Sequence, residues 1–278
     1  MTGTKRSLIL LAPVTAVLGL FFLVPLGMML VTSFTDPVTG VGNYTSVAAS
    51  PAVHVVLLIT FRIAALTTIV CLLLGFPYAY YLTLCSRRRA LILLAISTAP
   101  LWTIAIVRLY AWTIILGRQG LINEVLIGIG LTDAPLDLIF NEVAVVVGMT
   151  HLLLPFMILI LYSNLKGIDK DLLVASSTLG ASKRQSFFKV LLPLARPGVF
   201  TGSILVFVIS LGFYITPAIL GGGSTITISL YIQKLVSLVQ WGRASAVSVA
   251  LLAITILFVL LADKFFGVKK ALFGGSRR

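Results

Sequence analysis

The residues that could carry chemistry are few and widely spaced. Four ionisable side chains fall within or at the edge of long apolar stretches, namely Arg62, Arg108, Glu142 and His151. An ionisable group costs free energy in such a setting, so each is a candidate functional group. Arg108 is more readily explained by a structural role, and His151 equally well by a hydrogen-bonded core position. No paired carboxylates, nucleophile triad or metal-ligand cluster accompanies them, which argues against a membrane enzyme.

A nucleotide-binding loop is also missing from the sequence. The chain contains no Gly-Lys pair, so it lacks the G-x-x-x-x-G-K-[ST] loop that holds phosphates in ATPases. The run from Gly221 to Ser224 follows an apolar stretch and indicates a turn or hinge instead. We therefore expect no cofactor in this chain, and any ATP must be hydrolysed by another subunit.

Composition places these residues in a membrane protein. The chain has 278 residues, of which 59% are hydrophobic and 10% charged, and its mean hydropathy is +1.12. Soluble proteins carry about 25% charged residues. Stretches long enough to cross roughly 30 Å of hydrocarbon occur at 8–33, 54–84, 90–116, 142–163, 198–220 and 244–262. The sequence predicts an all-α bundle of about six transmembrane helices.

The positive charges predict an orientation. With the N-terminus in the cytoplasm, cytoplasmic segments hold sixteen of the Lys and Arg residues and external loops hold three, Arg118, Lys234 and Arg243. The cytoplasmic set is Lys5, Arg6, Arg87, Arg88, Arg89, Lys166, Lys170, Lys183, Arg184, Lys189, Arg196, Lys264, Lys269, Lys270, Arg277 and Arg278. This bias predicts that both termini are cytoplasmic. The net charge of +13 is then a topology signal and needs no nucleic-acid partner.

The cytoplasmic loop at about 164–197 is too polar to span a membrane and too long for a simple turn. Asp169 and Asp171 suit the first turn of a short helix, and Leu172, Ala175, Ser176 and Leu179 follow on one face of it. Gly180 can end this helix in a left-handed conformation. Ser182 and Gln185 form a capping-box pattern for a second helix, which we expect to stop near Pro193 and Pro197.

The small residues of this loop would let another protein approach closely. They are Ala175, Ser176, Ser177, Gly180 and Ala181. The pattern alone leaves two interpretations equally open: a knob that docks into a cytoplasmic partner, or an amphipathic loop that lies on the membrane surface.

The stretch DLLVASSTLGASKRQSFFKVLLPLARPGV resembles the coupling loop of bacterial ABC importer permeases, which carries EAA, then Gly, then Leu-Pro. Ala175, Gly180 and Leu192-Pro193 match this pattern, whereas Val174 replaces its Glu and Ser176 its second Ala. The segments APLWTIAIVRLYAWTIILGRQGLIN, LLPFMILILYSNLKGID, TPAILGGGSTITISLYIQ and WGRASAVSVALL resemble the spermidine/putrescine-type subfamily.

The resemblance implies a type I importer permease fold, with one transmembrane domain over 1–278 in the bacterial inner membrane. It implies a second permease, two ATPase subunits that bind ATP-Mg, and an external solute-binding protein as partners. The residues expected to contact the ATPase are Asp171, Val174, Ala175, Ser176, Leu179, Gly180 and Ala181.

The solute implied by the resemblance is a polyamine or a related amine. Ammonium groups bind to aromatic faces, and Tyr110, Trp112, Tyr214 and Trp241 are candidates for the path, although Trp112 and Tyr214 could equally pack against neighbouring helices. Two alternatives remain open. The chain could be a stand-alone secondary transporter or channel, or it could import a phosphonate, iron or an opine-like compound.

Overall fold

The computed structural model describes residues 2–169 and 171–266, which contain helices and no strand. Five of these helices are long and apolar enough to cross a membrane, and a sixth span results if one bent pair of helices counts as one. The all-α prediction is confirmed. Lys170, Lys269, Lys270, Arg277 and Arg278, which entered the charge argument, lie outside the described residues.

The chain divides into two compact units, Met1–Val55 with Tyr231–Ile256, and Val56–Leu230 with Leu257–Arg278. The first unit contains α1 (Thr2–Thr35), α2 (Gly42–Ala48), the start of α3 (Pro51–Leu84), most of α12 (Ile228–Ser237) and most of α13 (Trp241–Phe266). That the chain is a single domain stays a prediction, because a division into compact units does not decide how many domains the chain has.

Hydrogen bonds in the first unit hold the loop after α1 against the start of α13. The Asp36 carboxylate accepts a hydrogen bond from the backbone N–H of Gly242 at 2.6 Å, and the Asn43 amide donates to the carbonyl of Asp36 at 2.7 Å.

Helix α1 itself exposes large apolar side chains such as Leu18, Phe21 and Leu23 around its circumference. A helix that is apolar all round requires lipid or another chain as its surroundings.

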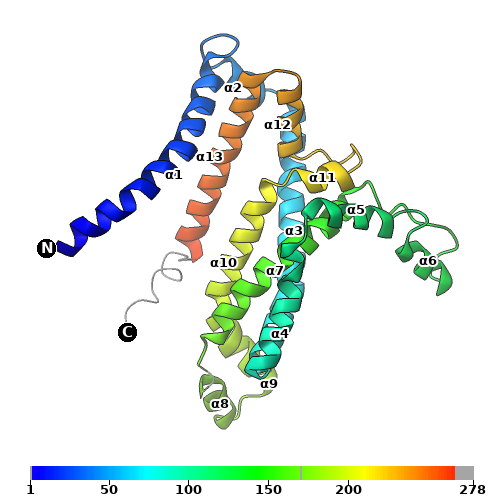
Figure 1. Ribbon diagram of the computed structural model, residues 1–278. Helices are drawn as coiled ribbons and strands as arrows, with labels where there is room; N and C mark the ends of the chain where they lie inside the picture. Colours follow the sequence, from blue (N-terminus) through cyan, green and yellow to red (C-terminus); the bar gives the residue numbers. More distant parts are fainter. Residues whose placement is uncertain (1, 170, 267–278) are drawn as a thin grey trace. The chain divides into compact units, whose positions relative to one another are not determined.

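The second unit is built around α7 (Glu142–Lys166), which packs along α10 (Leu192–Leu211), as Figure 1 shows. Met157 of α7 is fully buried and fills the space left by two glycines. A Cβ added to Gly202 of α10 would lie 2.8 Å from Met157 Sδ, and one added to Gly75 of α3 would lie 3.0 Å from its Cγ. Small residues thus allow the helices to approach closely, as is usual in membrane bundles.

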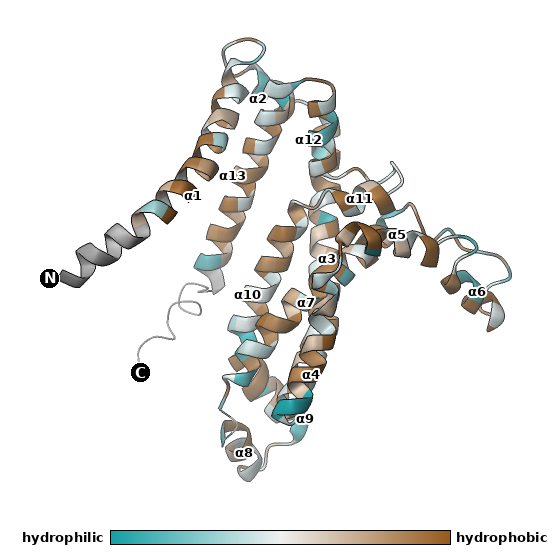
Figure 2. Cartoon of the chain, viewed as in Figure 1, coloured by the Kyte–Doolittle hydropathy of each residue, from teal (hydrophilic) through white to brown (hydrophobic). Residues whose placement is uncertain are grey.

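The remaining elements of the second unit are short. They are α4 (Arg87–Thr98), the 3₁₀ helix η1 (Ala99–Trp102), α5 (Ala105–Ile115), α6 (Leu121–Gly128), α8 (Asp171–Thr178), α9 (Lys183–Ser186), the π-helix η2 (Phe187–Leu191) and α11 (Ile215–Leu220). Figure 2 shows hydrophobic colours along α7 and α10 and hydrophilic ones near α9.

The predicted span at 90–116 is not one straight helix. Arg87–Trp102 and Ala105–Ile115 meet at an angle of 95°. Thr103 adopts an extended conformation between them, and both its backbone N–H and its hydroxyl donate to the carbonyl of Pro100. The side-chain hydrogen bond gives the backbone an alternative to helix continuation, a feature that hydropathy alone does not reveal.

The predicted limits of the fifth span, 198–220, and of the short helix before it were also wrong. The helix ends at Leu211 and restarts at Ile215, so that Pro217 falls in a first turn, where its missing N–H is not needed. Pro193 and Pro197 do not stop the preceding helix, which continues through η2 into α10. The wider turn of the π-helix before Pro193 eases the clash that a proline ring makes with the preceding turn.

Candidate functional site

The segment 171–186 forms the two short helices that the sequence predicts. α8 begins at Asp171, and the Asp169 carboxylate accepts a hydrogen bond from the Asp171 N–H at 3.0 Å. Gly180 follows α8 with φ +84°, a left-handed conformation that glycine adopts without steric cost. Ser182 and Gln185 form the capping box, with side chain and backbone bonded reciprocally at 3.3 and 2.9 Å. The predicted start of α8, the left-handed Gly180 and the capping box are confirmed here, whereas the second helix continues past its predicted end.

One side of α8 contacts the rest of the second unit through a hydrogen bond. The hydroxyls of Ser176 and Ser186 lie 2.7 Å apart in a hydrogen bond. Behind this bond lies a hollow of about 490 Å³, lined by residues of α3, α8, α9 and η2: Tyr80, Leu84, Leu173, Ser177, Ala181, Lys183, Ser186, Phe187 and Leu191. The segment therefore has a fixed inner side, although α8 and α9 are short.

The outer side of α8 is free and partly apolar. Leu179 is 88% exposed and Val174 61% exposed, and Asp171, Ala175 and Gly180 are exposed as well. Ser176 and Ala181 are half-buried toward the unit. The predicted ATPase-contacting residues thus divide into an exposed set and two that support α8 from behind. A Cβ on Gly180 would meet nothing within 4 Å, so the space beside it is open.

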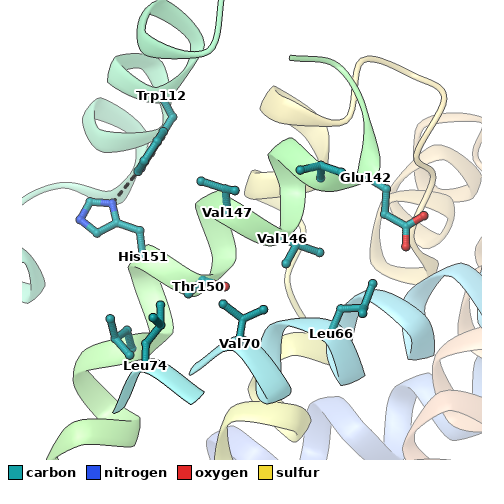
Figure 3. A pocket seen from close by; sticks show the side chains of 11 residues that line it. Leu66, Val70, Leu74, Trp112, Glu142, Val146, Val147, Thr150 and His151 are labelled. Carbon is teal, nitrogen blue, oxygen red and sulfur yellow. Dashed lines mark hydrogen bonds between the residues drawn. The ribbon is translucent and has the colours of Figure 1, made fainter. Parts of the chain in front are cut away.

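A separate cavity of about 630 Å³ lies between α3, α5 and α7 (Figure 3). Apolar side chains form most of its wall: Leu66, Val70, Leu74, Val143, Val146, Val147 and Leu154. The polar lining consists of Glu142, Thr150 and the pair of Trp112 and His151.

Both ends of this cavity carry specific polar contacts. Two nitrogens of Arg62 in α3 donate hydrogen bonds to the Glu142 carboxylate, and Arg62 Nε lies 2.7 Å from Glu142 Oε1. At the other end, Trp112 Nε1 donates a hydrogen bond to His151 Nδ1 at 2.9 Å. The accepting Nδ1 carries no proton, which fixes the proton of the neutral ring on Nε2. Three of the four ionisable side chains noted in the apolar stretches, Arg62, Glu142 and His151, thus make contacts at this cavity, and the fourth, Arg108, does not line it.

The predicted path aromatics do not gather at one place. Trp112 lines the cavity, whereas Tyr110 is 59% exposed and Tyr214, which precedes α11, is 39% exposed; neither belongs to the cavity wall. Trp241 starts α13 in the first unit and lines a different hollow of about 390 Å³ with residues of α1 and α12. The pairing of Arg62 with Glu142 was not predicted. The sequence feature that could have indicated it is one basic and one acidic residue, each in or at the edge of a different apolar segment.

Among the residues that the structure describes, no group of three or more His, Cys, Asp or Glu side chains could hold a metal ion. Outside the spans, Arg118 and Asp137 form an exposed ion pair at 2.7 Å. This pair raises the pKa of Arg118, first through the hydrogen bond to Asp137 and then through its charge. Like the Arg62–Glu142 pair, it joins a guanidinium to a carboxylate, but it lies outside the spans.

Comparison with known proteins gives a consistent result. The family described as "Binding-protein-dependent transport system inner membrane component" matches residues 2–268. The spermidine/putrescine transport system permease protein PotB of Haemophilus influenzae is 34% identical over 97% of this chain and 96% of its own. PotB of Escherichia coli is 34% identical over 82% of this chain and 83% of its own.

Among solved structures, the bacterial alginate ABC transporter in complex with an alginate pentasaccharide-bound periplasmic protein contains a similar chain. Its TM-score is 0.75 at 18% identity, over 94% of each chain. The predicted type I importer permease fold is confirmed.

Proposed function

The chain belongs to the family of binding-protein-dependent transport system inner membrane components, and from that premise we propose that it is the permease of an ATP-driven polyamine importer. The observation that carries the proposal is the 34% identity to a spermidine/putrescine permease along nearly the whole of both chains. Membership of this family makes the chain a transport subunit of the inner membrane and not an enzyme. Polyamine is the specific solute class that we propose.

The partners follow from the same premise. A second permease would complete the path, two ATPase subunits would bind ATP-Mg, and an external binding protein would deliver the solute. The exposed side of α8, with Val174, Leu179 and the open space at Gly180, supports docking of an ATPase there. ATP-driven closure of the two ATPases would draw the α8 segments together and switch the permeases between two states.

The orientation that we propose puts α8, α9 and both termini in the cytoplasm. Tyr80 and Leu84, which lie within seven residues before Arg87–Arg89 in the chain, line the same hollow as Ser177 and Lys183. Two basic segments therefore lie at one end of the second unit, as the positive-inside rule requires of a cytoplasmic end. Cysteine labelling from outside intact cells should reach Ser46→Cys and miss Ser177→Cys. Labelling of Ser177→Cys would reverse the orientation.

Within the path, we propose that Trp112, Tyr110, Tyr214 and Trp241 provide aromatic surface for cationic groups. Trp112 has the best support, because it lines the cavity of the second unit. The other three are exposed, which leaves them available to the solute or to the second permease.

Uptake of labelled solute tests the function. The chain is produced with its partner subunits in cells that lack their own polyamine import. We expect ATP-dependent accumulation of spermidine or putrescine, and excess unlabelled phosphonate or ferric iron should not reduce it. Accumulation of one of those solutes without polyamine uptake would overturn the assignment. Uptake by the chain without any ATPase would favour a secondary transporter.

A further inference from the structure

The cavity of the second unit combines a long apolar wall with separate polar groups. Glu142 stands at the first residue of α7 and His151 nine residues later, which corresponds to about 14 Å of helix rise. Figure 3 shows Glu142 at one end and the Trp112–His151 pair at the other, with Val146, Val147 and Val70 between them. Such a wall fits a linear, flexible ligand that is apolar along its length and polar at its ends.

Thr150 is the second indication of a ligand. A threonine hydroxyl within a helix normally donates to the carbonyl four residues earlier, as Thr60 does to Val56 and Thr68 to Ala64, both at 2.7 Å. The hydroxyl of Thr150 makes no such bond, and its hydrogen-bonding neighbour is the thiol of Cys71, a weak partner, although the residue is only 7% exposed and lines the cavity. A buried hydroxyl that has only a weak partner lowers stability, and a hydrogen-bonding ligand in the cavity would give it a stronger one.

Glu142 indicates that the ligand carries a positive charge. Its side chain is 25% exposed, whereas the Arg62 side chain that pairs with it is 57% exposed. Arg62 can therefore swing into open surroundings, but the carboxylate is held at the start of α7 and remains in the cavity wall. A carboxylate left without Arg62 requires another cation. Arg62 has the charge and the hydrogen-bond donors that an incoming ammonium group would have.

We propose that this cavity binds a linear aliphatic amine, with Arg62 as the cation that its ammonium group replaces on Glu142. The methylene chain lies along the valines and leucines. A second ammonium group donates to the Thr150 hydroxyl and lies against the Trp112 ring, which the hydrogen bond to His151 holds in place. The inference rests on the proposed function and deepens it by assigning the amine a site within this chain. A lipid acyl chain would fill the apolar wall but would leave Glu142 and Thr150 without new partners.

Direct binding tests this site separately from transport. The assembled transporter, with both permeases and the ATPases but without the binding protein, is placed in nanodiscs and titrated with labelled 1,8-diaminooctane, a linear diamine whose charges are at its ends only. Glu142→Gln should weaken binding at least tenfold, because the ammonium group loses a charge-assisted hydrogen bond. Thr150→Val, which keeps the shape, should weaken it about threefold because the lost partner is a neutral hydroxyl.

Arg62→Gln should have the opposite effect and tighten binding of the diamine, because it removes the competing cation. A purely structural ion pair would respond to both substitutions with loss. Asp137→Asn is the matched control: it removes the carboxylate from the exposed Arg118–Asp137 pair, which lies outside the cavity wall, and should leave binding unchanged.

The outcomes separate the two proposals. If the complete transporter imports spermidine but Glu142→Gln binds the diamine as the unaltered protein does, or if Arg62→Gln weakens its binding, the site is overturned and the function stands. Saturable binding that a fatty acid displaces and Glu142→Gln does not affect would identify a lipid site. If the complete transporter imports no polyamine, the proposed function fails and this inference fails with it.

Discussion

The coupling segment at 171–186 and the cavity at α3, α5 and α7 are held together in different ways. In the coupling segment, the bonds that fix the structure join residues at most ten positions apart, such as Ser176 with Ser186 and Ser182 with Gln185. In the cavity, Arg62 and Glu142 are 80 positions apart, and Trp112 and His151 are 39 apart. The first region is shaped by local backbone chemistry and the second by helix packing.

This difference predicts different responses to substitution. A change on the exposed side of α8 alters the surface that a partner protein contacts, and leaves the permease folded. A change at a close helix contact of α7 alters the packing itself, because the side chains at such a contact are tightly packed. Variants of the two regions, measured for both folding and transport, will test whether this division holds.

The largest effect is expected at Gly180. Gly180→Asp should abolish transport and loosen the ATPase from the membrane complex, because a charged side chain would occupy the open space where the ATPase is proposed to approach. The permease should still insert, since Asp tolerates the left-handed conformation at modest cost. The measurements are solute uptake and co-purification of the ATPase.

Gly130→Asp is the matched control for this variant. Gly130 also has a positive φ, +72°, and open space around its Cβ position, but it lies after α6. Its substitution carries the same backbone cost without the proposed contact. Normal solute-stimulated ATP hydrolysis by Gly180→Asp would contradict docking at α8.

What the sequence could predict follows the same division. Asp171, Gly180, Ser182 and Gln185 act on their own neighbours in the chain, so the start of α8, its end and the capping box were all predictable. The bend after Pro100 and the continuation of the helix through Pro193 were not. They depend on how Thr103 bonds to the preceding turn and on a π-helical turn, and hydropathy reports neither.

The cavity was predictable only in its parts. Arg62, Glu142 and His151 stood out as charged or polar groups in apolar segments, and Trp112 as an aromatic candidate. Their pairing needs the relative rotation of α3, α5 and α7, which depends on close contacts at glycines such as Gly75 and Gly148. Periodicity within one helix does not contain that information.

The second largest effect should be a loss of stability at Gly148 of α7. A Cβ there would collide with Leu220 and Thr216 of α11, both fully buried. Gly148→Ala should destabilise the protein by about 1–3 kcal/mol, the usual cost of overpacking. Cys71 is buried and free, so in a Cys85→Ser background its reaction with a thiol dye during heating reports unfolding.

Gly19→Ala provides the comparison for Gly148→Ala. Gly19 lies within α1, and a Cβ at that position would meet nothing within 4 Å. Alanine should be neutral or slightly stabilising there, because it favours helix by about 0.5–1 kcal/mol over glycine. Equal unfolding temperatures for the two variants would show that the packing around α7 is looser than its contacts indicate.

A smaller effect is expected at Tyr214, a predicted path residue outside the cavity wall. If the solute is cationic, Tyr214→Ala should slow uptake about tenfold, since a cation–π contact contributes roughly 0.5–2 kcal/mol. Basal ATP hydrolysis should be unchanged. Tyr214→Phe keeps the ring and should retain most of the activity. Equal loss in both variants would assign the role to the hydroxyl, and no loss in either would remove Tyr214 from the path.

The smallest effect is expected at Val174, where this chain departs from the coupling-loop pattern that it resembles. Val174 is 61% exposed on the fourth residue of α8, so Glu at this position would remain in solvent. A negative charge near a helix N-terminus is stabilising by about 0.3–1 kcal/mol. Val174→Glu should therefore fold normally, and uptake and ATPase co-purification should match the unaltered protein if α8 fits the groove used by related permeases.

Val174→Lys is the informative comparison for Val174→Glu, because the lysine has similar exposure and the opposite charge. If the groove is shaped to accept Glu, Lys should impair ATPase binding where Glu does not. Impairment by Glu itself would mean that the ATPase of this transporter has adapted to an apolar side chain, so that the docking surface is specific to this permease.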